Sequence, residues 1–281
     1  MKVLVTGANG QLGYDVIKRL NALGDEPVGA DREEFDITES KATEDYITAL
    51  RPDAVVHCAA YTAVDKAEDD RDTCRRVNVD GTRNIALACE KIGAKLVYIS
   101  SDYVFGGSGT KPLEINDPKD PQNIYGITKL GGETEATKCK KYFIVRTSWV
   151  FGINGGNFVK TMLRLADSHD KLTVVDDQTG SPTYTPDLAR LICDMIKTEK
   201  YGTYHASNEG YCTWAEFAKE IMRQVGKTTE IVPCTTAEYP AKAKRPENSR
   251  LSKKCLDDAG FDRLPPWQDA LARFLKELDL V

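Results

Sequence analysis

Tyr125 and Lys129 lie four residues apart in the segment IYGITKLGGE, residues 124–133. Residues at positions i and i+4 of a helix share one face, so a helix here would present a phenol and an ammonium to the same pocket. A hydride that reaches a ketone carbon leaves negative charge on the oxygen, which needs a proton donor within hydrogen-bond reach. A phenol with a pKa near 10 is a weak acid, but a nearby ammonium stabilises the phenolate left behind. Most such pairs are surface neighbours, so this one needs support from the rest of the chain.

A group of polar side chains supplies that support at the end of a predicted strand. The stretch VYISSDYVFG, residues 97–106, places Ser100, Ser101 and Asp102 where an apolar run stops. Ligands of open α/β sheets bind outside the carboxyl ends of the strands. Ser101 could therefore hold a substrate carbonyl oxygen and fix its geometry.

A glycine turn near the start of the chain predicts a dinucleotide site. VLVTGANGQLG, residues 3–13, spaces Gly7, Gly10 and Gly13 as GxxGxxG directly after an apolar run and at the start of a helical pattern. Glycines allow a tight turn and a close backbone approach, and the free amides at a helix N-terminus attract a pyrophosphate. A glycine triplet alone is weak evidence, but its place at the first strand-to-helix junction supports dinucleotide binding.

The residues that follow the second and third apolar runs bear on the cofactor. Asp31 stands about 20 residues beyond the glycines, where a carboxylate accepts hydrogen bonds from an adenosine ribose, whereas its neighbour Arg32 could pair with the 2′-phosphate of NADP. NADH and NADPH both remain possible. Ala59 and Ala60 are small enough to let a flat ligand lie against the backbone, although tight packing explains them equally well.

The elements that must position these residues follow a regular alternation in the first half of the chain. Short apolar runs are separated by helical patterns, which is typical of βαβ units around a parallel sheet covered on both faces. We predict an α/β fold with a doubly wound, Rossmann-like parallel sheet. The predicted strands are residues 2–6, 27–31, 53–58, 95–100 and 142–148, with helices at 11–23, 83–93 and 124–133.

The composition changes near residue 149, which predicts a smaller C-terminal lobe that binds substrate. We expect residues 1–148 to form the dinucleotide-binding domain and 149–281 to form mainly the substrate lobe, with segments near 171–206 able to return to the first sheet. Beyond residue 148, helices are predicted at 157–166, 186–196, 213–226 and 266–278, and strands at 171–175 and 202–207.

Bulk properties favour a small-molecule partner. The 281 residues carry 38 Lys and Arg against 43 Asp and Glu, a net charge of −5 without long runs of one sign, so no footprint for nucleic acid appears. Eight scattered cysteines show no spacing for zinc, and we expect reduced, mostly buried thiols. The first residues enter a strand directly and no apolar stretch is long enough for a membrane span, so a soluble, cytoplasmic protein is expected.

Together these motifs resemble the extended branch of the short-chain dehydrogenase/reductase superfamily. The segments GANGQLG, AAYTAVDKAE, SSDYVF, YGITKLGGE, RTSWVFGINGGNFVKTM, DQTGSPTYTPDLA and RPENSRL are similar, in order, to the dTDP-4-dehydrorhamnose reductase family over nearly the whole chain. The resemblance implies reduction of the 4-keto group of dTDP-4-dehydro-β-L-rhamnose by NADPH or NADH, giving dTDP-L-rhamnose. Ser101 stands where that family usually has threonine, which keeps the hydroxyl.

The resemblance also implies the roles of individual residues. The catalytic set would be Ser101, Tyr125 and Lys129. Ser101, Asp102, Tyr103 and Trp149 would line the sugar pocket, and Arg245 could meet the diphosphate, because a guanidinium matches phosphate in a bidentate way. The predicted cofactor-binding residues are Gly7, Gly10, Gln11, Leu12, Gly13, Asp31, Arg32, Asp36, Ile37, Ala59, Ala60, Tyr61, Tyr125 and Lys129.

Two alternative functions and a possible magnesium site remain to be considered. Related dehydratases carry an Asp-Glu pair where this chain has Asp102 and Tyr103, which argues against dehydration, and an epimerase of the same branch would need further acid and base groups. A regulatory subunit similar to that of methionine adenosyltransferase could bind dinucleotide without catalysis. Asp15 matches one position of a magnesium site that some family members have at a dimer interface, but TYTPDLA does not supply the rest, so no metal is assigned and the state is monomer or homodimer.

Overall fold

Six parallel strands form the central sheet in a computed structural model, which describes residues 1–239 and 241–281. Two neighbours flank the first strand, and the strand order reverses beside it, which creates the switch point where ligands of doubly wound sheets bind. The predicted α/β class is confirmed. In order across the sheet the strands are β2 (Glu26–Ala30), β1 (Lys2–Thr6), β3 (Ala54–His57), β4 (Lys95–Ser101), β5 (Tyr142–Thr147) and β10 (Gly202–His205).

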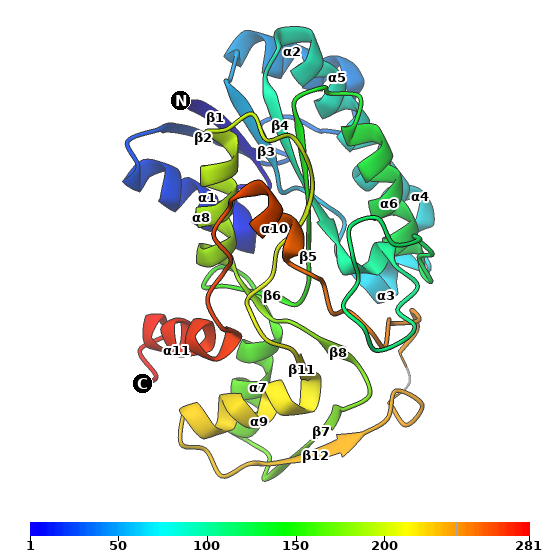
Figure 1. The fold of residues 1–281 in the computed structure, drawn as a ribbon, viewed down its shortest axis with the longest axis vertical. Helices are drawn as coiled ribbons and strands as arrows, with labels where there is room; N and C mark the ends of the chain where they lie inside the picture. The colour runs from blue at the N-terminus through cyan, green and yellow to red at the C-terminus, as the bar shows by residue number, and fades with distance from the viewer. Residues whose placement is uncertain (240) are drawn as a thin grey trace.

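Helices cover both faces of this sheet (Figure 1). One face packs against α1 (Gln11–Ala22), α8 (Thr185–Ile196) and α10 (Lys254–Ala259), and the other packs against α2 (Ser40–Leu50), α5 (Thr82–Ile92) and α6 (Ile124–Ala136). Two short helices, α3 (Val64–Ala67) and α4 (Arg71–Arg75), and a π-helical turn over Arg76–Gly81 connect β3 to α5.

Strand side chains alternate between the two layers. Val3 and Val5 of β1 belong to the core beneath α1 and α8, whereas Leu4 between them belongs to the core beneath α2 and α5. On β4, Val97 and Leu96 divide in the same way. All five are fully buried. This burial on both faces explains why the strands read as continuous apolar runs in the sequence.

Helix α2 is an element that the sequence pattern did not predict. Its buried residues are Thr43 and Ile47, so its apolar stripe is too short to stand out. It ends at Arg51, whose backbone adopts a left-handed conformation (φ 48°) that usually selects glycine. Neither the helical periodicity nor the stop signal was therefore visible in the residue types.

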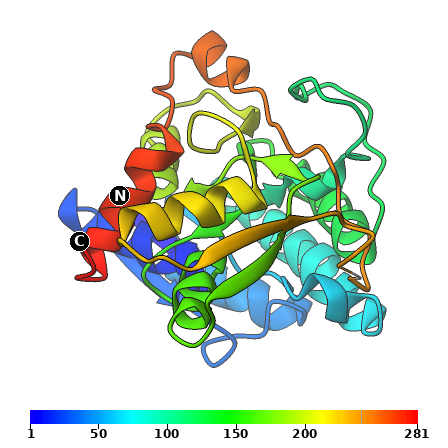
Figure 2. The ribbon, with the colours of Figure 1, turned by 90° about the horizontal axis from the view of Figure 1, so that it is seen from below.

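The smaller lobe has its own apolar core and lies below the sheet in Figure 1. Figure 2 shows α9 lying across the parallel pair β7 and β12. Its elements are β6 (Val150–Phe151), α7 (Phe158–Ala166), β7 (Lys171–Val175), β8 (Thr179–Gly180), β9 (Thr183–Tyr184), β11 (Cys212–Thr213), α9 (Trp214–Gln224), β12 (Glu230–Cys234) and α11 (Trp267–Glu277).

The segment 171–206 divides between the two lobes. Its first strand, Lys171–Val175, pairs with Glu230–Cys234 in the smaller lobe. Its last strand, Gly202–His205, pairs in parallel with β5 and completes the edge of the six-stranded sheet. Between them, α8 packs on α1 beneath the same sheet. The chain thus leaves the large lobe after β5, returns to it for α8 and β10, and returns once more for α10.

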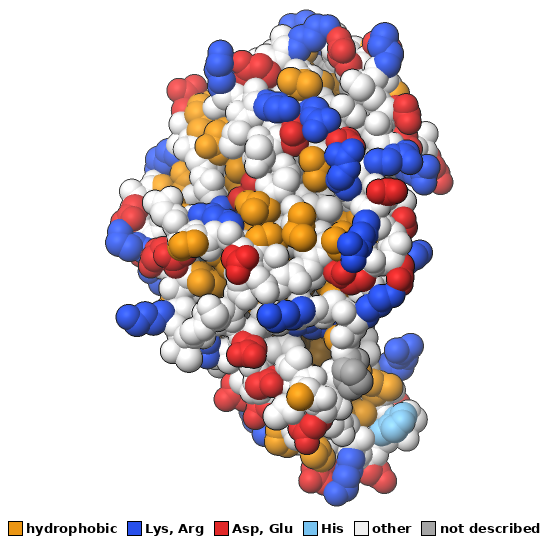
Figure 3. All heavy atoms as spheres, turned by 90° about the vertical axis from the view of Figure 1, so that its right-hand side faces the viewer, with side chains coloured by type: hydrophobic (Ala, Val, Ile, Leu, Met, Phe, Trp, Pro, Cys, Tyr) orange, Lys and Arg blue, Asp and Glu red, His pale blue; other side chains and the backbone are white. Residues whose placement is uncertain are grey.

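The surface carries both signs of charge. On the face shown in Figure 3, basic and acidic side chains are interspersed over both lobes. Within residues 1–239 and 241–281, no helix combines the length and the apolar character that crossing a membrane requires. The eight cysteines all lie in the described residues, are free thiols, and six of them are buried.

Candidate active site

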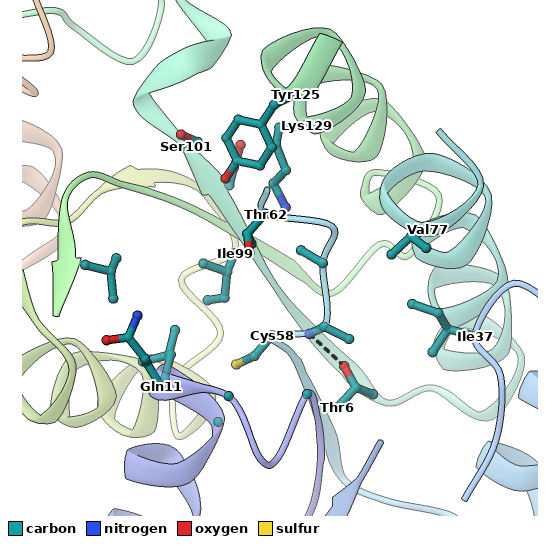
Figure 4. A pocket seen from close by; sticks show the side chains of 18 of the residues that line it. Thr6, Gln11, Ile37, Cys58, Thr62, Val77, Ile99, Ser101, Tyr125 and Lys129 are labelled. Atoms are coloured by element: carbon teal, nitrogen blue, oxygen red, sulfur yellow. Dashed lines mark hydrogen bonds between the residues drawn. The ribbon is translucent and has the colours of Figure 1, made fainter. Parts of the chain in front are cut away.

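A cavity of about 980 Å³ lies along the carboxyl ends of the central strands and reaches the smaller lobe. The glycine turn and the loops after β2 and β3 form one part of its wall, and the end of β4 and the first turns of α6 form another. Figure 4 shows Ser101, Tyr125 and Lys129 at one end, with Ile37 and Val77 on the opposite side of the cavity. Its position agrees with the general rule for ligand binding by doubly wound sheets.

The glycine turn is shaped by close backbone contacts. Gly7 has a left-handed backbone (φ 66°), and a Cβ added there would come within 2.7 Å of the amide nitrogen of Ala59. A Cβ on Gly13 would overlap the carbonyl oxygen of Gly7. Only glycine therefore permits this packing of the turn against the loop after β3. Helix α1 begins directly afterwards at Gln11, so its free amides face the cavity.

The acidic residue after β2 contacts the glycine turn. The Asp31 carboxylate accepts a hydrogen bond from the backbone amide of Asn9, with an N···O distance of 2.9 Å. Its neighbour Arg32 is 87% exposed at the side chain and pairs with Asp36 at 3.3 Å. Asp31 is thereby held at the turn, whereas the Arg32 guanidinium extends into solvent beside the cavity.

At the end of β4, three consecutive residues form a hydrogen-bonded turn. The Ser101 hydroxyl donates to the Asp102 carboxylate at 2.8 Å and accepts from the backbone amide of Tyr103 at 3.2 Å. Asp102 is buried, and burial raises the pKa of its carboxyl group to about 6, a rise that the nearby hydroxyls of Ser249 and Ser101 oppose. One Asp102 oxygen, Oδ2, is buried without a hydrogen-bond partner among the described residues and lies in the cavity wall.

Helix α6 begins immediately before Tyr125. Asn123 caps it by accepting the backbone amide of Gly126 at 2.8 Å, and a Cβ on Gly126 would overlap the carbonyl oxygen of Tyr103. The first turn therefore sits directly on the loop after β4. Tyr103 and Tyr125 meet edge to face, with ring centroids 5.5 Å apart. The cap and the close backbone approach fix Tyr125 beside Ser101 (Figure 4).

Burial changes the acid strengths of the Tyr125 and Lys129 side chains in the same direction, toward their neutral forms. It raises the pKa of the Tyr125 phenol, and the proximity of the Ser101 hydroxyl opposes the rise. It lowers the pKa of the Lys129 ammonium to about 7, with Glu133 opposing the fall. We expected Lys129 to strengthen Tyr125 as an acid, but the largest influence on the pKa of the phenol is its desolvation by burial. The Lys129 Nζ lies 4.2 Å from the ring centroid of Tyr98.

Two tryptophans line the end of the cavity that adjoins the smaller lobe. The rings of Trp149 and Trp214 are stacked, with centroids 3.6 Å apart and planes inclined by 14°. Trp149 has a left-handed backbone (φ 49°), and Gly180 lacks the Cβ that would touch its indole. Trp214 is held at the start of α9 by a reciprocal capping box between Thr213 and Glu216. A left-handed tryptophan is unusual enough to mark a functional position.

Most of the predicted site residues line this one cavity. Tyr61 and Arg245 stand outside the lining. The backbone amide of Tyr61 donates to Asn78 at 2.8 Å, and the Arg245 guanidinium pairs with Asp65 at 2.6 Å. The predicted residues in the lining are Gly7, Gly10, Gln11, Leu12, Gly13, Asp31, Arg32, Asp36, Ile37, Ala59, Ala60, Ser101, Asp102, Tyr103, Tyr125, Lys129 and Trp149.

The cavity also contains residues that the sequence argument missed. Trp214 follows a threonine that starts a helix, but nothing in its spacing shows that it meets Trp149. Val77 and Arg76 come from the π-helical turn, which has no clear residue signature. Thr6 and Cys58 lie at the carboxyl ends of β1 and β3, next to Gly7 and Ala59, which were predicted to bind the cofactor. The rule that ligands bind at the carboxyl ends of the strands could therefore have identified them. The further lining residues are Ala30, Phe35, Thr38, Thr62, Val64, Thr73, Ile99, Ser100, Thr147, Ser148 and Val150.

The residues around Asp15 do not fit a magnesium ion. The Asp15 carboxylate is buried against α8 and accepts a hydrogen bond from Thr185 at 2.5 Å, and desolvation raises its pKa. Magnesium prefers an octahedral set of oxygen ligands that includes charged carboxylates and water. In the described part of the chain, no three His, Cys, Asp or Glu side chains gather into a metal-binding group. We therefore derive no step through a metal.

Comparisons with known proteins give one consistent result. The family described as RmlD substrate binding domain matches residues 1–280. The spore coat polysaccharide biosynthesis protein SpsK of Bacillus subtilis is 43% identical over 277 residues, covering 98% of this chain and 97% of that protein. A dTDP-4-dehydrorhamnose reductase of Streptomyces griseus is 39% identical, covering 95% and 91%.

A solved structure agrees with the sequence relatives. The dTDP-4-dehydrorhamnose reductase of Bacillus anthracis, determined in complex with NADP, has 44% identity and a TM-score of 0.96, covering 98% of this chain and 99% of that one. Such agreement over whole chains confirms the resemblance that the ordered motifs predicted. The protein described here belongs to the dTDP-4-dehydrorhamnose reductase family of oxidoreductases.

Proposed function

We propose that this protein reduces the 4-keto group of dTDP-4-dehydro-β-L-rhamnose and releases dTDP-L-rhamnose, using NADPH or NADH. The observation that carries the proposal is the convergence of Ser101, Tyr125 and Lys129 on one cavity with the glycine turn. A proton donor and a dinucleotide cradle in the same cavity are the two parts that a carbonyl reduction needs. The name of the B. subtilis relative suggests that the product serves polysaccharide synthesis.

The residues of the turn fit a dinucleotide. Gly7 and Gly13 allow the turn to pack closely on its neighbours, where a Cβ would overlap the backbone, and the amides at the start of α1 are free to bind a pyrophosphate. Ile37 and Val77 offer two apolar side chains at the end remote from Tyr125, which suits an adenine ring. When bound, the nicotinamide would supply the hydride to the ketone carbon.

The chain's own residues would supply the proton. Tyr125 is protonated at neutral pH because its pKa is raised, and it gives its proton to the oxygen as the hydride arrives at carbon. In its ammonium form, Lys129 stabilises the resulting phenolate. Ser101 orients the carbonyl oxygen by hydrogen bonding, once its hydroxyl turns from Asp102 toward the substrate. One hydride and one proton convert the ketone to an alcohol.

The sugar is expected to lie between the end of β4 and the tryptophans. The unpartnered oxygen of Asp102 is an acceptor for a sugar hydroxyl, and Trp149, stacked on Trp214, offers an aromatic face. Arg245 could reach a diphosphate only by exchanging its ion pair with Asp65.

Replacing Arg32 by alanine should separate the two cofactors. Because Arg32 is exposed and paired only at the surface with Asp36, its guanidinium is free to meet a 2′-phosphate. A charge-assisted hydrogen bond is worth about 1.5–3 kcal/mol, so the KM for NADPH should rise about tenfold or more while the KM for NADH stays the same. Initial rates with each cofactor measure this. An equal rise for both would assign Arg32 to the structure of the loop instead.

The decisive experiment is an assay with the proposed substrate. Purified protein is mixed with NADPH or NADH and enzymatically generated dTDP-4-keto-L-sugar, and the loss of reduced-nicotinamide absorbance is followed. We expect turnover that depends on the dTDP-sugar. No turnover with either cofactor, together with tight binding to another protein, would instead indicate a regulatory subunit that binds dinucleotide.

A further inference from the structure

A buried ion pair lies directly behind the proposed acid. Glu133 is one helical turn beyond Lys129 on α6, which itself is one turn beyond Tyr125, so the three side chains occupy one face of the helix. The Glu133 carboxylate accepts hydrogen bonds from Arg146 on β5, with both N···O distances 2.7 Å. The Ser100 hydroxyl on β4 donates to the same carboxylate at 2.6 Å. Glu133 and Arg146 are both nearly inaccessible to solvent.

A buried ion pair such as Glu133–Arg146 is an expensive way to fill the core, in terms of folding free energy, if it only packs against its neighbours. Two charges removed from water pay a desolvation penalty that their attraction often fails to recover, and apolar replacements of similar size are frequently as stable. Arg146 is engaged further by the carbonyl oxygen of Ile115 at 2.9 Å and by the ring of Phe105, 5.1 Å away. Arg146 on β5 and Ser100 on β4 thus fix the Glu133 carboxylate in position. Its negative charge acts in a region of low dielectric, where electrostatic interactions are stronger than in water.

The negative charge of Glu133 affects the protonation of Lys129, because the surroundings of Lys129 favour its neutral form. Burial lowers the pKa of the Lys129 ammonium, and Glu133 is the largest influence that acts against the fall. Burial keeps most of the other groups neutral near pH 7: it lowers the pKa of His57 to about 3, raises that of Cys58 to about 12, and also raises the pKa values of Cys74, Tyr98 and Tyr125. The titratable groups that face Lys129 in the described structure are His57 at the end of β3, Cys58 directly after it, Cys74 on α4, Tyr98 on β4, and Tyr125 and Glu133 on α6.

We propose that Glu133 is a positioning residue for the reaction, whose carboxylate, held by Arg146 and Ser100, keeps Lys129 in its ammonium form beside Tyr125. Glu133 touches neither substrate nor cofactor and acts through Lys129. The inference deepens the proposed function, because it explains how a lysine buried in the cavity wall retains the proton that its role requires. The Glu133–Arg146 pair would therefore serve the reaction as well as the stability of the fold.

The test measures Lys129 directly, in the protein without substrate. Lysine labelled with ¹³C at Cε is incorporated, the Lys129 signal is assigned by its loss in Lys129→Met, and its chemical shift is followed against pH. In Glu133→Gln the pKa of Lys129 should fall by at least about one unit, as expected when an opposite charge close to an ammonium is removed. The alkaline limb of kcat/KM, where Lys129 loses its proton, should move to lower pH by the same amount.

Two further variants separate charge from structure. Glu133→Gln/Arg146→Met removes both charges, so that neither is left buried without its partner, and it should fold while still lowering the pKa of Lys129, by less than the single variant. Glu135→Gln is the matched control: Glu135 is on the same helix, buried, and paired with Arg83 at 2.9 Å, but that pair connects α6 to α5. It should leave Lys129 unchanged.

An unchanged pKa of Lys129 in either folded Glu133 variant would overturn the proposal, as would an equal fall in Glu135→Gln. If Glu133→Gln does not fold, the double variant decides alone. Failure of the reductase assay would not affect the result, because the titration needs neither cofactor nor sugar.

Discussion

Tyr125→Phe is expected to lower kcat for ketone reduction by about 10²- to 10⁴-fold, the range that a positioned general acid contributes. The variant loses one oxygen atom, whereas the ring keeps its edge-to-face contact with Tyr103 and α6 keeps its cap at Asn123. The dissociation constant for NADPH should therefore remain nearly the same. Steady-state rates and a fluorescence titration of NADPH measure the two quantities on the same preparation.

Tyr142→Phe is a suitable control, because Tyr142 begins β5 at the end of the sheet opposite to the cavity. It should leave kcat unchanged. If Tyr125→Phe reduced NADPH affinity as strongly as turnover, the phenol would be a structural group of the cofactor site and another proton donor would have to be found.

Gly13→Ala should weaken NADPH binding at least tenfold and lower the melting temperature. The new Cβ would overlap the carbonyl oxygen of Gly7, so the turn must move away from α1 and its amides must lose their common direction. Overpacking of this kind costs about 1–3 kcal/mol, and each tenfold loss of affinity corresponds to about 1.4 kcal/mol.

Gly156→Ala makes the same chemical change where a Cβ would meet no atom within 4 Å and the backbone is not left-handed. Its NADPH affinity and melting temperature should match those of the parent protein. Unchanged affinity in a folded Gly13→Ala protein would show that the dinucleotide does not depend on the tight turn, and the cofactor assignment would fail with it.

The parts of the fold and site that could be predicted from the sequence are those that depend on residues close together along the chain. The spacing of Gly7, Gly10 and Gly13 after an apolar run predicts a turn, and the four-residue spacing of Tyr125 and Lys129 predicts a shared face. Both depend on local geometry that any strand or helix repeats. The position of Ser101 followed from a general property of parallel sheets, since all strand ends meet at one edge.

The remaining features depend on contacts between distant segments. Trp214 faces Trp149 because α9 of the smaller lobe packs against the segment after β5, and no periodicity in either segment encodes that meeting. Arg245, which could meet a diphosphate, is paired with Asp65, a residue 180 positions away. The partners of Glu133 lie on strands β4 and β5, so nothing in its own helical segment indicates a buried ion pair. The residue type limits the chemistry of each of these side chains, but the tertiary fold determines which side chains they contact.

The late return of the chain to the large lobe has a consequence for synthesis on the ribosome. Strand β10 and helix α8 come after residue 184, and the α8 side chains Leu188, Ile192 and Met195 cover one face of the sheet. A nascent chain that has emerged only to β5 therefore presents Val97 and Phe143 uncovered, with an open strand edge beside them. Exposed apolar faces and unpaired edges are the features that invite aggregation and chaperone binding. The large lobe becomes complete only after α10, which ends at Ala259, has been made.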